Sequence, residues 1–208
     1  MSKKSGTAIF FEALIAFALA FLLSFYDVFY SFDSLLRDKA YQQPRGINNK
    51  IKIVAIDDKT LQEIGPFGTW SRSVYADVIE KLGDYPAVIA MDIMVFGDMD
   101  SEGDEALRAA CEESGRVISG SYINYTTAYK TDEKGKPYID HFNIDSIEQP
   151  IIAGCTATGF VNASSDEDGI VRSAILSEDF EGVTYKSFAA TIYSKYCEFL
   201  GISENIPA

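Results

Sequence analysis

Residues 87–123 read AVIAMDIMVFGDMDSEGDEALRAACEESGRVISGSYI, and this stretch decides the fold class. Its first ten residues (87–96) are an almost continuous apolar run, which is typical of a strand covered on both faces. Residues 101–115 have amphipathic spacing and predict a helix that ends at Gly115. Residues 116–123 predict a second strand. This order of strand, helix and strand indicates two parallel strands joined by a helical crossover.

The same alternation extends toward the N-terminus. Residues 51–57 (IKIVAID) form another β-branched apolar run of strand length. Residues 71–85 predict an amphipathic helix that begins at Ser71 and stops at Gly83. Three strands separated by two helices therefore predict an α/β fold with a mostly parallel sheet flanked by helices.

The chain after residue 123 is expected to add an antiparallel element. Residues 125–150 are polar and interrupted by proline, which predicts a long surface excursion. Residues 156–163 and 170–179 predict two strands that form an antiparallel hairpin. A helix over residues 185–201 would close the domain.

Residues 7–30 predict one transmembrane helix before this domain. From Thr7 to Tyr26 the only charged residue is Glu12, and about 20 apolar residues suffice to cross a hydrocarbon core. The alternative is a cleaved signal peptide, because Ala18-Leu19-Ala20 has the spacing of a cleavage site. This triplet lies inside the apolar run, whereas a cleavage site follows such a run. An uncleaved anchor is therefore the prediction.

The predicted organisation has five parts. They are a cytoplasmic tail (1–6), the transmembrane helix (7–30), a juxtamembrane helix and linker (31–50), an extracytoplasmic sensory domain (51–200) and a tail that we expect to be truncated (201–208). Two alternatives stay open at this point, because the chain is either a fragment of a longer receptor or an anchored protein that pairs with another one.

Composition narrows the function classes. The 208 residues carry a formal net charge of −13 without a basic stripe, so no nucleic-acid partner is expected. Three cysteines, Cys111, Cys155 and Cys197, are too few and too dispersed for a disulfide framework or a zinc site. They predict buried core residues, although one pair could bridge in an oxidising compartment. No cofactor and no bound metal are expected.

Carboxylates follow two of the predicted strands. Asp57 and Asp58 end the first strand, while Asp92 lies in the second. Because ligands bind beyond the carboxyl ends of parallel strands, these oxygens could hold Mg²⁺ or Ca²⁺ in a metal-dependent hydrolase. The structural alternative is that Asp58 caps the helix that follows. No His or Lys is placed to complete an acid–base set, so no catalytic residue is predicted.

The turn SSDEDG (164–169) also carries acids but fits calcium poorly. In an EF-hand alignment its twelfth position would be Ile175, where a bidentate carboxylate is required. A tight turn with Gly169 supplying the unusual backbone dihedrals is the better account. Arg172 could pair with Asp166 or Asp168 and hold this turn.

Several motifs together resemble a known family. IVAIDDKTLQEIG, WSRSVYADVIEKL, AVIAMDIMVFGDMDSEGDEALRAACEESGRVI and GFVNASSDEDGIVRSAIL occur in this order. They resemble the second type of cyclase/histidine-kinase-associated sensory extracellular domain, from about Ile51 to Tyr196. Family members often have Trp-Pro-Trp before the arginine, and here Gly68-Thr69-Trp70 stands instead. One aromatic residue of that patch is therefore missing.

The resemblance implies a bacterial receptor module outside the cytoplasm. It implies a cytoplasmic N-terminus, membrane helices on both sides of the domain, and a nucleotide cyclase or protein kinase as output. No output domain lies in this chain. A homodimer in the parent receptor and an extracytoplasmic signal are the expected partners.

The predicted function is signal sensing without catalysis by this chain. The residues predicted to respond to the signal are Asp57, Asp58, Trp70, Arg72 and Asp92. The residues predicted to shape a structural turn are Asp166, Asp168, Gly169 and Arg172. Two other classes stay open, namely the anchored metal-dependent hydrolase and an anchored interaction scaffold.

Overall fold

The structure is a computed structural model that describes residues 6–25, 30–43, 46, 48–131, 133–166 and 169–206. The chain divides into an N-terminal unit, Met1–Ala55, and a C-terminal unit, Ile56–Ala208. Each unit is described separately below.

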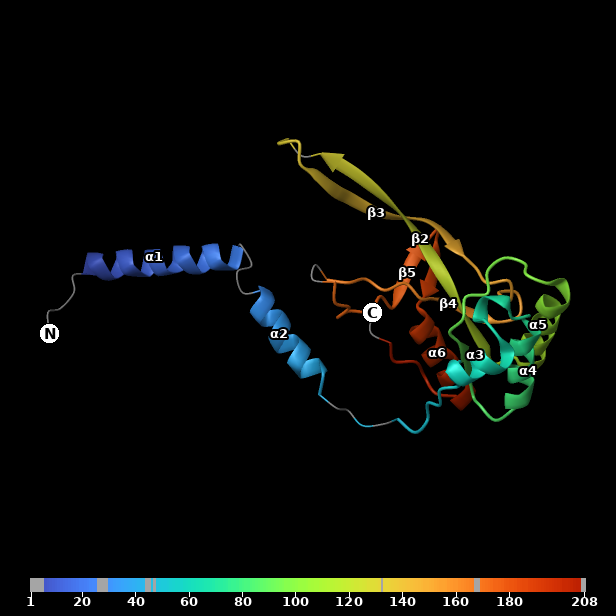
Figure 1. Cartoon of the computed structure of the whole chain (residues 1–208). Helices are drawn as coiled ribbons and strands as arrows, with labels where there is room; N and C mark the ends of the chain where they lie inside the picture. Colours follow the sequence, from blue (N-terminus) through green and yellow to red (C-terminus); the bar gives the residue numbers. More distant parts are fainter. Residues whose placement is uncertain are drawn as a thin grey trace. The chain divides into compact units, whose positions relative to one another are not determined.

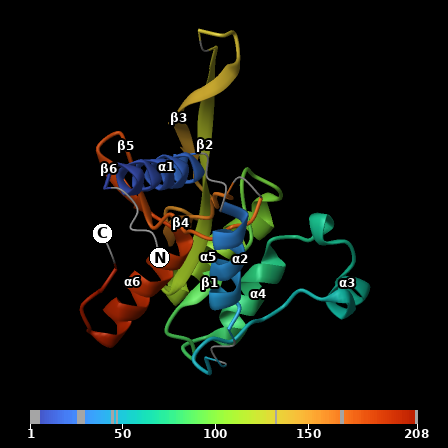
Figure 2. The same ribbon diagram turned by 90° about the vertical axis from the view of Figure 1, so that its left-hand side faces the viewer.

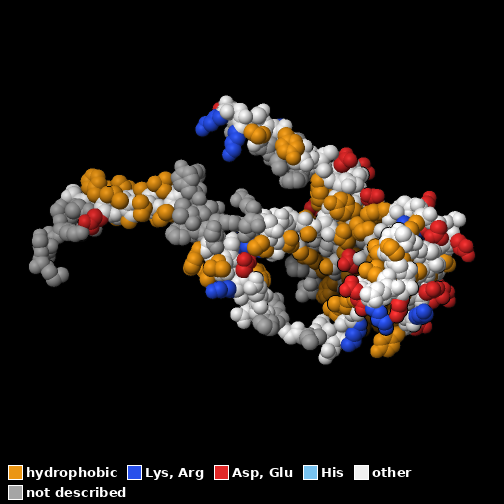
Figure 3. All heavy atoms as spheres, in the orientation of Figure 1, with side chains coloured by type: hydrophobic (Ala, Val, Ile, Leu, Met, Phe, Trp, Pro, Cys, Tyr) orange, Lys and Arg blue, Asp and Glu red, His pale blue; other side chains and the backbone are white. Residues whose placement is uncertain are grey.

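The described residues of the N-terminal unit form two helices, α1 (Gly6–Phe25) and α2 (Tyr30–Tyr41). Apolar side chains of α1 are exposed along its length, as the orange spheres in Figure 3 show. Within the described residues, no helix has both the length and the apolar character that crossing a membrane requires. The span predicted over residues 7–30 is not confirmed and stays a prediction. Its residues 26–29, like residues 1–5 of the tail, lie outside the described part.

The strand predicted over residues 51–57 is wrong. The described structure has no strand there, and the side chains of Ile53 and Val54 are 87% and 69% exposed. An apolar run becomes a strand only where a neighbouring backbone satisfies its N–H and C=O groups. No described strand pairs with this segment.

The C-terminal unit is built on a mixed sheet (Figure 1). Strands β1 (Ile89–Met91) and β4 (Ala157–Phe160) pair in parallel with the two sides of β2 (Val117–Thr131). Strand β3 (Pro137–Glu148) pairs antiparallel with β2. The parallel pairs confirm the predicted β-α-β crossover, whereas the sheet as a whole is mixed.

Residues 125–150 are not a long surface excursion, which corrects the prediction. They continue β2 and form β3, and this long hairpin extends away from the rest of the unit (Figure 2). The segment is rich in Tyr, Thr and Ile, residues that favour strands, and its turn includes Gly135 with a φ of +76°. The sequence did not predict these strands because their residues are polar. A hairpin that extends into solvent does not need an apolar face.

The hairpin predicted between residues 156–163 and 170–179 is also wrong. Strand β4 takes up only Ala157–Phe160 and pairs with β2. Strand β5 (Ser177–Phe180) instead pairs antiparallel with β6 (Val183–Lys186). Glu181 and Gly182, the two residues between them, both have positive φ, as a tight hairpin turn of the primed type requires.

In the part of this unit that the structure describes, four helices and one 3₁₀ turn accompany the strands. They are α3 (Asp58–Ile64), η1 (Phe67–Thr69), α4 (Ser73–Leu82), α5 (Ser101–Ser114) and α6 (Phe188–Leu200). Helix α5 is capped by the Asp100 side chain and ends at Gly115 in the left-handed conformation. The predicted helices over 71–85, 101–115 and 185–201 are thereby confirmed, with ends shifted by a few residues.

The core lies on both faces of the parallel strands. One cluster joins α4, α5 and β2 and contains Ile79, Leu107, Cys111, Val117 and Ile152. Ile118 and Phe160 are buried outside this cluster, and α6 packs against β2 and β4. Because neighbouring strand residues alternate between faces, Val117 and Ile118 serve opposite layers.

The loop after β4 is attached to β2 by the Asn162 side chain, which makes the two hydrogen bonds that a neighbouring strand would make. The Asn162 amide accepts a hydrogen bond from the Ile123 N–H and donates one to the Ile123 carbonyl, both at 2.8 Å. Asn162→Ala is expected to cost about 1–2 kcal/mol of unfolding free energy, since both backbone groups lose their partner. Asn124→Ala is the matched control, because Asn124 makes an exposed bond to Ser146. Equal urea midpoints for the two variants would contradict this role.

Candidate functional site

Asp57 and Asp58 lie at the start of α3. The sequence suggested Asp58 as the residue that caps this helix. Asp57, rather than Asp58, is the N-cap, and its carboxylate accepts hydrogen bonds from the Thr60 N–H (2.9 Å) and hydroxyl (2.8 Å). These bonds lower the pKa of Asp57. Both aspartates are exposed. Asp57 therefore has a defined structural task, while Asp58 stays open to solvent.

Trp70 is the buried member of a group of three aromatic side chains. Its side chain is 4% exposed, and the indole N–H donates to the Gly65 carbonyl at 2.8 Å. The rings of Phe67 and Tyr75 lie 5.5 and 6.4 Å from it, centroid to centroid. Trp70 thus fixes the segment between α3 and α4.

Arg72 forms the most elaborate polar contact of the unit. Its guanidinium donates to the Asp104 carboxylate (2.8 Å) and to the carbonyls of Gly97 (2.7 Å) and Phe96 (2.9 Å). The second oxygen of Asp104 accepts from the Met99 N–H at 3.0 Å. Arg72 and Asp104 are 6% and 1% exposed. The pair ties the start of α4 to α5 and to the loop after β1.

Asp92 follows β1 and is exposed. Among the described residues, no three His, Cys, Asp or Glu side chains form a group that could hold a metal ion. Asp57, Asp58 and Asp92 therefore do not assemble the cation site considered for a hydrolase. The assignment of these residues, with Trp70 and Arg72, to signal sensing stays a prediction.

The acidic turn has the predicted pairing. Arg172 donates to the Asp166 carboxylate at 2.9 Å, and its side chain is 5% exposed. Within the turn, the Gly169 N–H donates to the Asp166 carbonyl, and Gly169 has a φ of +80°. Asp168 lies outside the described residues. The contacts of Asp166, Gly169 and Arg172 are those of a structural turn.

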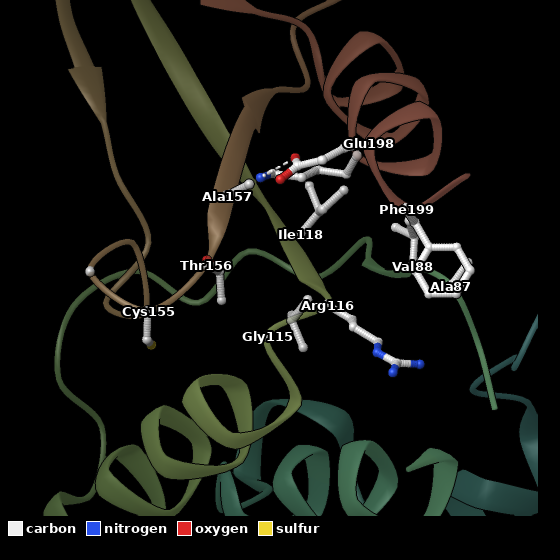
Figure 4. A pocket seen from close by; sticks show the side chains of 13 residues that line it. Ala87, Val88, Gly115, Arg116, Ile118, Cys155, Thr156, Ala157, Glu198 and Phe199 are labelled. Atoms are coloured by element: carbon white, nitrogen blue, oxygen red, sulfur yellow. Dashed lines mark hydrogen bonds and ion pairs between the residues drawn. The ribbon is translucent and has the colours of Figure 1, made fainter. Parts of the chain in front are cut away.

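A cavity of about 600 Å³ lies at the amino ends of the parallel strands (Figure 4). The sequence had suggested a site at their carboxyl ends. The walls of the cavity come from the residues at the amino ends of β1, β2 and β4 and from the last turns of α6. The lining residues used below are Val88, Arg116, Cys155, Thr156, Lys195, Glu198 and Phe199. The strand starts and the end of the helix thus line one open cavity.

The charged side chains of this cavity are held in place. The Arg116 guanidinium donates to the carbonyls of Asp84 (2.7 Å) and Pro86 (2.9 Å) and pairs with the Asp84 carboxylate at 2.9 Å. It also lies over the Phe199 ring, 5.6 Å from its centroid. Lys195 pairs with Glu198 at 2.7 Å along α6. The cavity therefore offers a preorganised cation and an ion pair with exposed atoms.

Sequence reasoning missed the cavity because it searched the carboxyl ends of the strands. Arg116 lies between the end of α5 and the first residue of β2, so its charge is located at the amino end of that strand. Lys195 and Glu198 are three residues apart on a predicted helix, the spacing of neighbours on one face. These two signals were readable, but their convergence on one cavity depends on the fold.

Comparisons with known proteins found one family. No match was found among curated proteins or among solved structures. A model of the CHASE2 domain matches residues 8–207, almost the whole chain. The chain therefore belongs to the CHASE2 family of extracellular sensory domains.

Proposed function

We propose that this chain senses a small polar molecule outside the cytoplasm as part of a bacterial membrane receptor. The observation that carries the proposal is the cavity, because its walls belong both to the rigid sheet and to α6. Its volume lies within the range of about 300–1,000 Å³ typical of small-molecule sites. Membership in a sensory, non-catalytic family supports the same conclusion.

The cavity has the geometry needed to convert binding into movement. A ligand between the strand starts and α6 would contact Arg116 on one wall and Lys195 or Glu198 on the other. It would favour the position of α6 in which both contacts form. A ligand shifts a conformational equilibrium only through such differential contacts. Helix α6 is therefore the proposed moving element.

The receptor context is the second part of the proposal. Residues 7–30 would anchor the domain with the N-terminus in the cytoplasm, and α2 would connect anchor and sensor. The exposed apolar side chains of α1 and the single acid Glu12 support an anchor. The parent receptor would be a homodimer whose output is a nucleotide cyclase or a protein kinase.

A thermal-shift screen of the full chain in detergent micelles tests the sensing proposal. The probes are amino acids, small carboxylates, sugars and nucleotides. A ligand present at 100 times its Kd is expected to raise the Tm by roughly 5–10 °C. Lys195→Ala and Glu198→Ala should remove at least half of that rise.

Lys81→Ala is the matched control for this screen, because Lys81 is an exposed lysine on α4, away from the cavity lining. It should keep the full rise. The proposal fails if no probe shifts the Tm, or if a shift persists unchanged in both cavity variants.

The sensing role first assigned to Asp57, Asp58, Trp70, Arg72 and Asp92 is kept as a hypothesis with a narrower test. Arg72 and Trp70 are buried and bonded, so their substitution would perturb folding as well as signalling. Asp58→Asn is the cleaner test in an intact receptor, because Asp58 is exposed and Asp57 supplies the cap.

A further inference from the structure

Two cysteines from distant parts of the chain meet beside the cavity. Cys111 lies on α5, is fully buried and belongs to the core cluster. Cys155 lies in the turn before β4, packs against the same cluster and also lines the cavity. In Figure 4 the Cys155 side chain points toward α5. Cys155 is thus a partly exposed residue in the cavity wall, and Cys111 is the buried member of the pair.

The two thiols lie near enough to influence each other's pKa, and Cys155 packs against the core cluster that contains Cys111. The Cys155 thiol donates to the Ile152 carbonyl at 3.2 Å. Burial and then the neighbouring Cys155 raise the pKa of Cys111 to about 12. Burial, with Glu112 nearby, raises the pKa of Cys155. Both thiols are therefore protonated at neutral pH, and their reaction requires an oxidant and time.

We propose that Cys111 and Cys155 close to a disulfide when the domain meets a disulfide oxidant outside the cytoplasm. The Cys155 thiolate attacks one sulfur of the oxidant and releases the other as a thiol. The Cys111 thiolate then attacks Sγ of Cys155 and releases the second thiol. The two cysteines lose two protons and two electrons, and the oxidant is reduced to two thiols. The extracytoplasmic placement rests on the proposed function, whereas the pairing rests on the geometry.

The bridge would change the cavity. It would tie the wall formed by Gly154, Cys155 and Thr156 to helix α5, and it would close a loop that contains the β2–β3 hairpin. A disulfide that closes a long loop restricts the unfolded chain and stabilises the folded one. The oxidised domain would therefore hold one wall of the sensing cavity more rigidly than the reduced domain.

Oxidation of the purified full chain in detergent micelles tests the pairing independently of cellular location. The reduced protein is incubated with oxidised glutathione, alkylated and digested without reductant. Mass spectrometry should find a peptide pair linked through Cys111 and Cys155, with Cys197 alkylated. The rate should rise steadily between pH 7 and pH 9, because the thiolate is the attacking species and burial raises the pKa of both thiols. The Tm should increase by roughly 5–15 °C.

Three variants make the test decisive. Cys197→Ser should leave the linked peptide unchanged. Cys155→Ser should abolish it, and Cys111→Ser should stop the reaction at a glutathione adduct on Cys155. The proposal is overturned if Cys111 and Cys155 of the unsubstituted chain are both found alkylated after oxidation. It is also overturned if that chain accumulates the same glutathione adduct as Cys111→Ser.

Discussion

Replacing Arg72 by alanine is expected to lower the free energy of unfolding of the C-terminal unit by about 3–5 kcal/mol, the usual cost of breaking a buried ion pair. Asp104 would keep a buried charge with only the Met99 N–H as a short partner. The carbonyls of Phe96 and Gly97 would also lose their donor. Urea unfolding followed by the fluorescence of Trp70, the only tryptophan, measures the loss.

Arg108→Ala is the control for this prediction. Arg108 also lies near acids of α5 and the preceding loop, but its ion pairs span 3.8 Å and its side chain is 38% exposed. Its removal should cost less than about 1 kcal/mol. Similar urea midpoints for the Arg72 and Arg108 variants would show that the buried pair is dispensable.

The Arg72–Asp104 pair also makes the stability of the domain depend on pH in the acid range. Burial alone would raise the pKa of Asp104, but the Met99 N–H and the Arg72 guanidinium outweigh it and lower the pKa. A carboxyl with a lowered folded pKa contributes stability above its unfolded pKa, near 3.9, and loses it as the pH falls through the folded pKa. The unsubstituted chain should therefore lose more stability below about pH 4 than Asp104→Asn does. Parallel acid profiles would exclude Asp104 as the source.

The accuracy of the sequence prediction follows the range of the interactions involved. Helices α4, α5 and α6 were readable because periodicity, capping residues and terminal glycines are local. The strand prediction for residues 51–57 failed because a strand needs a neighbouring strand to pair with, and apolar character alone does not supply one. The prediction for residues 125–150 failed for the opposite reason, since these residues pair with each other in two successive strands and their polarity did not prevent pairing.

The site was less predictable than the fold. The turn pair Asp166–Arg172 was foreseeable, because its members are only six positions apart in the sequence. Arg72 and Asp104 are 32 residues apart, and nothing local to either residue indicates the other. The cavity needs three strand starts and one helix end to converge, so its residues become a set only after the topology is known.

Replacing Gly159 by alanine is expected to cost about 2–3 kcal/mol, although it adds a single methyl group. A Cβ at this position in β4 would lie 2.6 Å from the Phe188 Cα, 2.8 Å from the Phe188 N and 2.7 Å from the Thr191 hydroxyl. Two of these atoms are backbone and cannot rotate away, so α6 must move off the sheet. The bond from the Thr191 hydroxyl to the Thr158 carbonyl would weaken as well.

Gly68→Ala separates this clash from the general effect of losing a glycine, because a Cβ at Gly68 meets no atom within 4 Å. Its urea midpoint should stay close to that of the unsubstituted chain. If α6 is the element that moves on binding, Gly159→Ala should also weaken the Tm rise caused by a cavity ligand, since Lys195, Glu198 and Phe199 move with the helix. A Gly159→Ala chain that is destabilised as expected but keeps the full Tm rise would show that α6 can shift without affecting the cavity, and helix displacement would then be excluded as the signal.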